Sequence, residues 1–229
     1  MSPSGLKNRF AKKTMTKKAL LKLTEILSSA YNCVDRFEAL EEKRGYNIGK
    51  ELPAHLFKRG IEYQLLEHWN DAPRDHELWS DGNNIAAGLV GCEWAAYLRV
   101  RNPEAIILRV DPKNRTARAD RLLCELLSSL ITNIATLVPA EFDIFPGLCR
   151  DNFELLARGG ARGIDAGCMI LEALPRLELH GTRFLCVLDA LNLAELGGQA
   201  DAVRQLKGVL RIVLARNRGH LLYTLARTR

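Results

Sequence analysis

An aspartate that follows an aliphatic run is the first candidate for chemistry in this chain. Residues 184–188 read FLCVL, and Asp189 comes directly after them. In an α/β domain that binds phosphate, a carboxylate at the end of a buried strand can hold Mg²⁺ directly or through water. Many structural strands also end in aspartate, because this side chain caps the following turn or helix. We therefore predict Asp189 as a metal ligand, with a structural cap as the alternative.

A glycine-containing loop is the second candidate. It starts at Gly82, continues with Asn83 and Asn84, and leads into helical sequence that contains Gly88. In a working phosphate loop, G-x-x-x-x-G-K-[ST], glycines let backbone N–H groups approach phosphate, while the Lys neutralises oxygens and the hydroxyl binds Mg²⁺. The loop from Gly82 is therefore predicted to offer its backbone to phosphate.

The side chains of a working phosphate loop are missing here. Counted from Gly82, the position of the second glycine holds Ala87, the position of the lysine holds Gly88, and the position of the hydroxyl holds Leu89. Only the first glycine matches. The loop alone would not identify a nucleotide site.

The elements that must position these residues alternate between strand-like and helix-like patterns. Aliphatic runs of strand length occupy residues 105–110, 184–188 and 220–226, and a short run with apolar flanks occupies residues 76–80. Apolar residues at helical spacing occupy residues 85–99, 122–134, 165–177 and 200–217, and a loop-rich stretch spans 138–163. Strands separated by helices pair in parallel, because a parallel return needs a long crossover. Continuous apolar strands fit a sheet that is covered on both faces.

The predicted fold class is therefore α/β, a three-layer parallel sheet with helices on both faces and a ligand at the carboxyl ends of the strands. Gly45, Gly49 and Pro53 interrupt the pattern after the first helical stretch. This interruption predicts a basic helical extension over residues 1–50 and the α/β domain over residues 51–229.

The order of these elements resembles the NACHT-type P-loop domain of nephrocystin-like and fungal STAND proteins. In that family a helix with an E-x-x-x-W-like pattern precedes an LW-x-x-G strand, the Walker B strand reads hhhhDALDEC, and the next strand ends in a T-S-R-like sensor. The resemblance covers residues 58–229 approximately and rests on Trp69, Leu78, Trp79, Gly82, Asp189, Ala190, Leu191 and Arg229.

What the resemblance implies is a site for ATP or GTP with Mg²⁺. Gly82 and the backbone after it would hold phosphate, Asp189 would hold Mg²⁺, and Arg229 would stand at the sensor position. The second Walker B acid of the family is replaced by Asn192, and the glutamate after it by Leu193. These losses imply weak nucleotide binding with little or no hydrolysis, as in a scaffold domain for signalling.

The family resemblance also implies protein partners. Helical elements follow the sensor strand in that family, whereas this sequence stops at Arg229. We expect a sheet edge or a helix face to remain uncovered, and self-association to follow.

Positive charge is concentrated at the N-terminus. Residues 1–22 hold seven basic side chains and no acidic one, which leaves 26 basic and 27 acidic residues from Leu23 onward. The segment is predicted to be a solvated tail that leads into a packed helix. The alternatives are an amphipathic helix on an anionic surface, a nucleic-acid arm and a mitochondrial presequence. No aromatic side chains alternate with the basic ones to stack on bases, so no specific nucleic acid is expected. The expected compartment is the cytoplasm, with mitochondria as the alternative that a presequence would imply.

The remaining candidates favour structural roles. The six cysteines lack C-x-x-C spacing and lie in or near apolar stretches, so they are predicted to be reduced core residues. The run from Arg158 to Gly163 is typical either of an anion cradle or of a flexible loop before a helix capped by Asp165. Because these patterns identify no catalytic group, the second hypothesis is an interaction module that binds no nucleotide.

Overall fold

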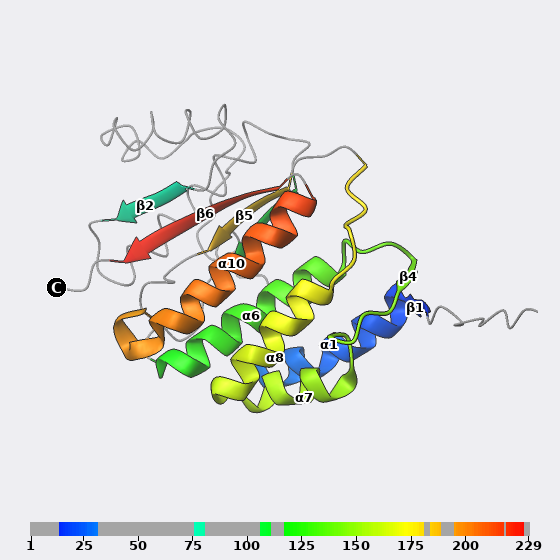
Figure 1. The fold of residues 1–229 in the computed structure, drawn as a ribbon, viewed down its shortest axis with the longest axis horizontal. Coiled ribbons are helices and arrows are strands. Elements are labelled where there is room, and N and C mark those ends of the chain that lie inside the picture. The colour runs from blue at the N-terminus through cyan, green and yellow to red at the C-terminus, as the bar shows by residue number, and fades with distance from the viewer. Residues whose placement is uncertain are drawn as a thin grey trace, which may run out of the picture.

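The computed structural model describes residues 14–31, 76–80, 106–110, 117–180, 184–188, 195–217 and 219–226. Its elements, in chain order, are β1 (Thr14–Thr16), α1 (Lys17–Tyr31), β2 (His76–Ser80), β3 (Ile106–Val110), α6 (Ala119–Ala135), β4 (Glu141–Asp143), α7 (Arg150–Arg158), α8 (Gly160–Ala173), β5 (Phe184–Leu188), the π-helical turn η1 (Glu195–Gln199), α10 (Ala200–Arg216) and β6 (Gly219–Ala226) (Figure 1). The predicted boundary at residue 50 and the predicted helix over 85–99 lie outside the described residues.

Four strands form a parallel sheet in the order β2-β6-β5-β3. Strand β6, the last of the four in the chain, therefore lies between β2, the first of the four, and β5, the third. All four strands fall on the short runs that the sequence singles out, and β5 matches its predicted range of 184–188. A second, antiparallel sheet joins β1 to β4.

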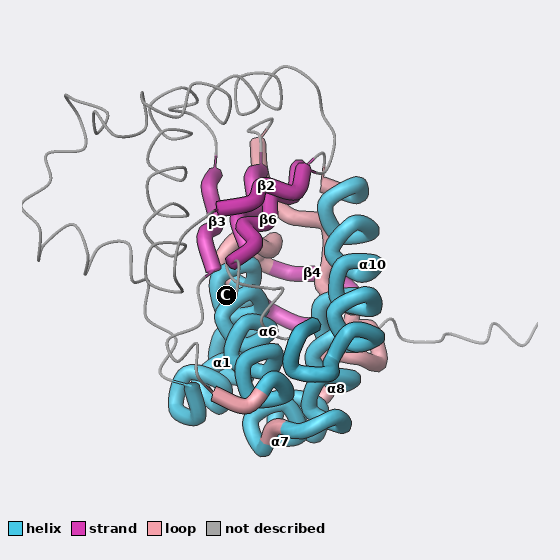
Figure 2. The backbone as a smooth tube through the Cα atoms, turned by 90° about the vertical axis from the view of Figure 1, so that its left-hand side faces the viewer, coloured by secondary structure: helices cyan, strands magenta, loops and turns pink. Residues whose placement is uncertain are grey.

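The described helices lie to one side of the parallel sheet in both views of the backbone (Figures 1 and 2). Helix α6 contacts β3 and helix α10 contacts β6. Helices α1, α7 and α8 pack on α6, α7 also packs on α1 and α8, and α8 also packs on α10. Helices on the opposite face, and with them the three-layer arrangement, stay a prediction.

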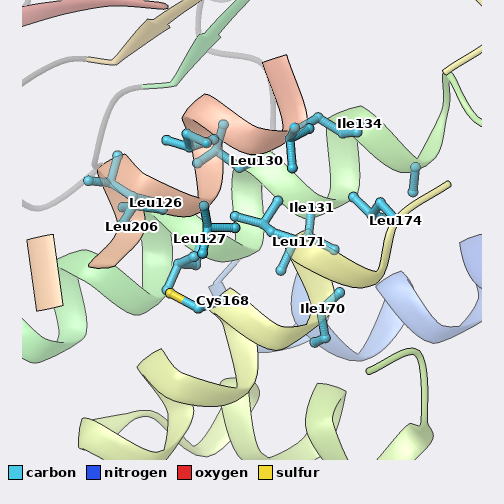
Figure 3. Close-up of a cluster of buried hydrophobic side chains, with 14 of the residues drawn as sticks. Leu126, Leu127, Leu130, Ile131, Ile134, Cys168, Ile170, Leu171, Leu174 and Leu206 are labelled. Carbon is cyan, nitrogen blue, oxygen red and sulfur yellow. The ribbon is translucent and has the colours of Figure 1, made fainter. Parts of the chain in front are cut away.

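Helix α6 forms the centre of the hydrophobic core. Its sequence, ADRLLCELLSSLITNIA, carries leucine or isoleucine on almost every side, and eleven of its seventeen residues are buried. Helices α1 and α8 both contact it. Figure 3 shows Leu127 and Ile131 of α6 next to Cys168 and Leu171 of α8. A helix that is apolar on several faces is stable only when other elements surround it.

Strand β5 connects this core to the sheet. Phe184, Cys186 and Leu188 are all buried and belong to the same hydrophobic cluster as the residues of α6. They alternate along the strand and so share one face. The strand that leads to Asp189 is thus fixed by the helical layer.

The segment 138–163, predicted as a loop, contains two elements that the prediction missed. Strand β4 occupies Glu141–Asp143 and helix α7 occupies Arg150–Arg158. Helix α8 begins at Gly160 rather than near Asp165, which is an exposed residue inside the helix and not its cap. The prediction was wrong because Gly159 and Gly160 read as a loop, whereas their positive φ angles make a tight connection between two helices.

Helix α1 belongs to this core. Its residues Leu20, Thr24 and Leu27 are buried, and the helix contacts α6 and α7. At its C-terminal end the Tyr31 hydroxyl donates a hydrogen bond of 3.0 Å to the carbonyl of Leu156 in α7. The apolar face of α1 is therefore occupied, as the packed-helix interpretation of the N-terminus expects.

Two side chains at the end of α10 hold the chain segment that leads into β5. Asn217 accepts a 2.7 Å hydrogen bond from the backbone N–H of Leu177 and donates one to the carbonyl of Val213. Arg216 donates to the carbonyl of Leu174 at 2.9 Å. Because β6 follows α10 directly, these bonds tie together the chain segments from which β5 and β6 start.

Close packing between α6, α7 and α8 predicts a difference between two glycines. A Cβ at Gly167 would lie 2.9 Å from Cδ1 of Leu127 and 3.2 Å from Cδ1 of Leu156. A Cβ at Gly208, inside α10, would meet no atom within 4 Å. Gly167→Ala should therefore lower the free energy of unfolding by about 1–3 kcal/mol through overpacking. Gly208→Ala should raise it by about 0.5–1 kcal/mol, because alanine favours helix.

Urea unfolding monitored by circular dichroism measures both changes. Equal effects of the two substitutions would contradict the close contact of α8 with α6 and α7.

Candidate functional site

The carboxyl edge of the parallel sheet is the candidate site. Because the strands are parallel, their carboxyl ends point to the same edge. Strand β2 ends at Ser80, β6 at Ala226 and β5 at Leu188, and these three strands are adjacent in the sheet. In open parallel sheets, ligands bind in the crevice beyond this edge.

The predicted site residues follow these three strands in the sequence. Gly82, Asn83, Asn84, Gly88, Asp189 and Arg229 all lie outside the described residues, so their own positions stay predictions. Asp189 comes one residue after the end of β5, Gly82 two residues after β2, and Arg229 three residues after β6. The sheet order therefore brings together the strands that lead to the three parts of the predicted site.

The strand ends are not level. Ser80 pairs with Ala226, whereas Leu188 pairs with Tyr223, three residues earlier on β6. Three residues of strand correspond to about 10 Å, and the two strand spacings that separate β2 from β5 add about 10 Å across the sheet. A ligand shared by the two segments requires the chain after Ser80 to fold back toward the end of β5.

Buried thiols in the described part of the chain have no reactive character. Burial raises the pKa of Cys124 to about 11 and that of Cys168 to about 12, and it also raises the pKa of Cys186 to about 12. These thiols are protonated at neutral pH, so they are poor nucleophiles and poor metal ligands. They fit the prediction of reduced core residues.

Cys149 departs from that prediction because it is exposed. It precedes the first residue of α7, and its side chain makes no capping hydrogen bond. The apolar residues before it predict burial, but only Leu148 is buried, whereas Ile144 and Phe145 are exposed like Cys149. Cys33 and Cys92 lie outside the described residues.

The described residues contain no cluster of three or more His, Cys, Asp or Glu side chains that could hold a metal ion. The predicted metal ligand, Asp189, is not among them. Within the same ranges, no helix is both long enough and apolar enough to cross a membrane.

The run from Arg158 to Gly163 is part of the helical packing. A Cβ at Gly163 would lie 3.0 Å from the carbonyl oxygen of Leu155, so this glycine permits the close approach of α7 and α8. Arg158 lies 3.6 Å from Glu154, its neighbour one turn earlier in α7. Gly163 therefore has a packing role, and Gly159 and Gly160 form the connection between α7 and α8. The anion cradle has no support beyond the start of a helix.

Comparisons of the chain with known protein families, curated proteins and solved structures gave no match. The candidate site therefore rests on the sequence and on the order of the strands.

The burial of three thiols predicts selective modification. With Ellman's reagent at pH 8 on the folded chain, Cys149 should react at a rate typical of an exposed thiol. Cys124, Cys168 and Cys186 should react at least ~100-fold more slowly, because they are buried and remain protonated at that pH. Mass spectrometry of proteolytic peptides assigns each modified residue. Fast modification of Cys186 would contradict the burial of β5 under the helices.

Proposed function

We propose that this protein is a degenerate nucleotide-binding or scaffold domain of the STAND/NACHT kind, which binds ATP or GTP weakly and hydrolyses neither at a measurable rate. The strand order β2-β6-β5-β3 carries this proposal. It makes neighbours of the strands that lead to Gly82, Arg229 and Asp189, which the family resemblance assigns to phosphate, sensor and Mg²⁺. The proposal therefore expects these three segments, which are far apart in the sequence, to meet at one edge of the sheet.

The buried face of β5 supports the role of Asp189. Phe184 and Leu188 are 0% exposed, so the strand is held firmly against the core up to the residue that precedes the aspartate. A ligand carboxylate benefits from such a fixed support, because a site on a rigid element keeps its geometry.

Missing side chains limit the affinity. Gly88 and Leu89 replace the lysine and hydroxyl of a working site, so one charge-assisted contact and one Mg²⁺ ligand are lost. Hydrogen bonds to charged groups contribute roughly 1.5–3 kcal/mol each, so two lost contacts correspond to about two to four powers of ten in affinity. Asn192 and Leu193 provide no carboxylate to orient or activate water, so hydrolysis suffers further.

Calorimetric titration with ATP and with GTP, each with and without Mg²⁺, tests this function. We expect dissociation constants of about 1 mM or weaker that do not change with Mg²⁺, and no phosphate release over hours. Micromolar affinity that depends on Mg²⁺ would contradict the proposed loss of the phosphate contact and of the Mg²⁺ ligand. Complete absence of binding at about 10 mM nucleotide would favour the interaction module instead.

Two variants sharpen the titration. The double change Gly88→Lys with Leu89→Thr restores the missing groups and should raise affinity at least ~10-fold if the loop keeps a phosphate-binding backbone. Its matched control is Asp201→Asn, which removes an exposed carboxylate of α10 whose partner is Arg204 and should leave binding unchanged. The same control serves Asp189→Asn after restoration, which should abolish any Mg²⁺ dependence.

The alternative is an interaction module whose basic N-terminal segment binds an anionic surface. It is favoured by the seven basic side chains in residues 1–22, among which Lys18 and Lys22 are exposed on α1. Insertion of α1 into lipid is disfavoured, because its apolar face packs on α6 and α7. Binding of this kind would rest on charge alone, and it would weaken steeply with salt.

A further inference from the structure

An exposed apolar patch lies beside β4, away from the four-stranded parallel sheet (Figure 1). Ile144 and Phe145 follow β4, and Met169 lies on α8, with 38%, 47% and 50% of their surfaces exposed. The two segments touch, since a Cβ at Gly147 would fall within 2.6 Å of the Cβ of Ala173 and still closer to the carbonyl oxygen of Met169. We call these three side chains the 144–169 patch. Large apolar side chains that gather on a surface mark contact sites.

Acidic side chains border the 144–169 patch. Asp165 and Glu172 lie four residues before and three residues after Met169, on the same exposed face of α8. Glu141 is exposed on β4, and Asp143 directly precedes Ile144. This border disfavours an anionic partner such as nucleic acid or acidic lipid.

Arg150, at the start of α7, and Arg216, which reaches Glu172, both have acceptors within the described residues. Arg150 donates a 2.7 Å hydrogen bond to Glu154, and Arg216 donates to the carbonyls of Glu172 and Leu174. The exposed acids Asp165 and Glu172 on α8 and Glu141 on β4 therefore favour a partner that combines positive charge with apolar side chains.

The chain's own N-terminal segment has this composition and starts beside the patch. In the β1–β4 pair, Thr14 is opposite Asp143, the residue before Ile144. Residues 1–13 hold four basic side chains and no acid, together with Leu6 and Phe10. Thirteen residues reach at most about 45 Å, so this segment stays near the patch at an effective concentration of the order of millimolar.

We propose that residues 1–13 dock on the 144–169 patch of the same chain. Phe10 and Leu6 supply apolar contact, and Lys7, Arg9, Lys12 and Lys13 face the acidic border. This docking keeps the basic segment on the protein, so an external anionic surface must compete with the patch for it. The inference is independent of nucleotide binding at the sheet.

Hydroxyl-radical footprinting of the full chain tests the docking. Phe145 and Met169 should be protected at low salt in the unmodified chain. Phe10→Ser combined with Lys12→Ser and Lys13→Ser should raise their modification by at least ~3-fold, as expected when a mostly occupied surface becomes free. Tyr31, at the far end of α1, reports unchanged folding in the same experiment.

A matched charge control separates docking from general electrostatics. Lys18→Ser with Lys22→Ser removes two exposed bases from α1 outside the segment, and it should leave Phe145 and Met169 protected. A rise from about 50 to 500 mM NaCl should expose both residues in the unmodified chain, because salt screens the acidic border.

Two results would overturn the proposal. Equal modification of Phe145 and Met169 in the unmodified chain and the triple variant shows that the segment does not cover the patch. Protection that grows with protein concentration shows that a second copy covers it instead. Circular dichroism of the triple variant verifies that it is folded.

Discussion

The burial of α6 is the constraint on which the described structure depends. This helix contacts β3 of the parallel sheet and the helices α1, α7 and α8, so it joins the sheet to most of the described helices. Each fully buried leucine or isoleucine contributes about 1.5–3 kcal/mol relative to an exposed one. Helix α8 lies close to α6 because Gly167 leaves room for Leu127, and close to α7 because Gly163 leaves room for the carbonyl of Leu155. Helix α6 thus connects β3 of the sheet to the other helices of the core.

That packing extends to the carboxyl edge of the sheet through β5 and α10. Phe184 and Leu188 anchor β5 in the same cluster as Leu206 of α10, while Asn217 links the end of α10 to the segment before β5. The proposed function needs this rigidity, because a site without lysine, hydroxyl or second acid depends on backbone placement. The docking of residues 1–13 concerns a different face of the protein and rests on apolar contact and charge. It is therefore independent of nucleotide binding at the sheet.

The sequence predicted the elements whose apolar patterns are strong and missed those whose pattern is interrupted. The run FLCVL at 184–188 and the leucine stripe of α6 are unambiguous, because only burial explains them. Helix α7 is polar on most sides, and the glycine pair after it has the composition of a loop, so the sequence predicts irregular structure for both. The bonds of Asn217 and the exposure of Cys149 depend on tertiary contacts that local patterns do not encode. For the candidate site, the sequence predicts the residues, and the described structure shows only that the strands before them are adjacent.

Hydrogen exchange with and without about 10 mM ATP tests the central claim most directly, because it locates even weak binding along the chain. A degenerate site at the carboxyl edge predicts slower exchange in residues 82–90 and 189–194, with α7 and α8 unchanged and with the same pattern when Mg²⁺ is removed. Unchanged exchange in both segments, or slower exchange confined to another part of the chain, would contradict the account.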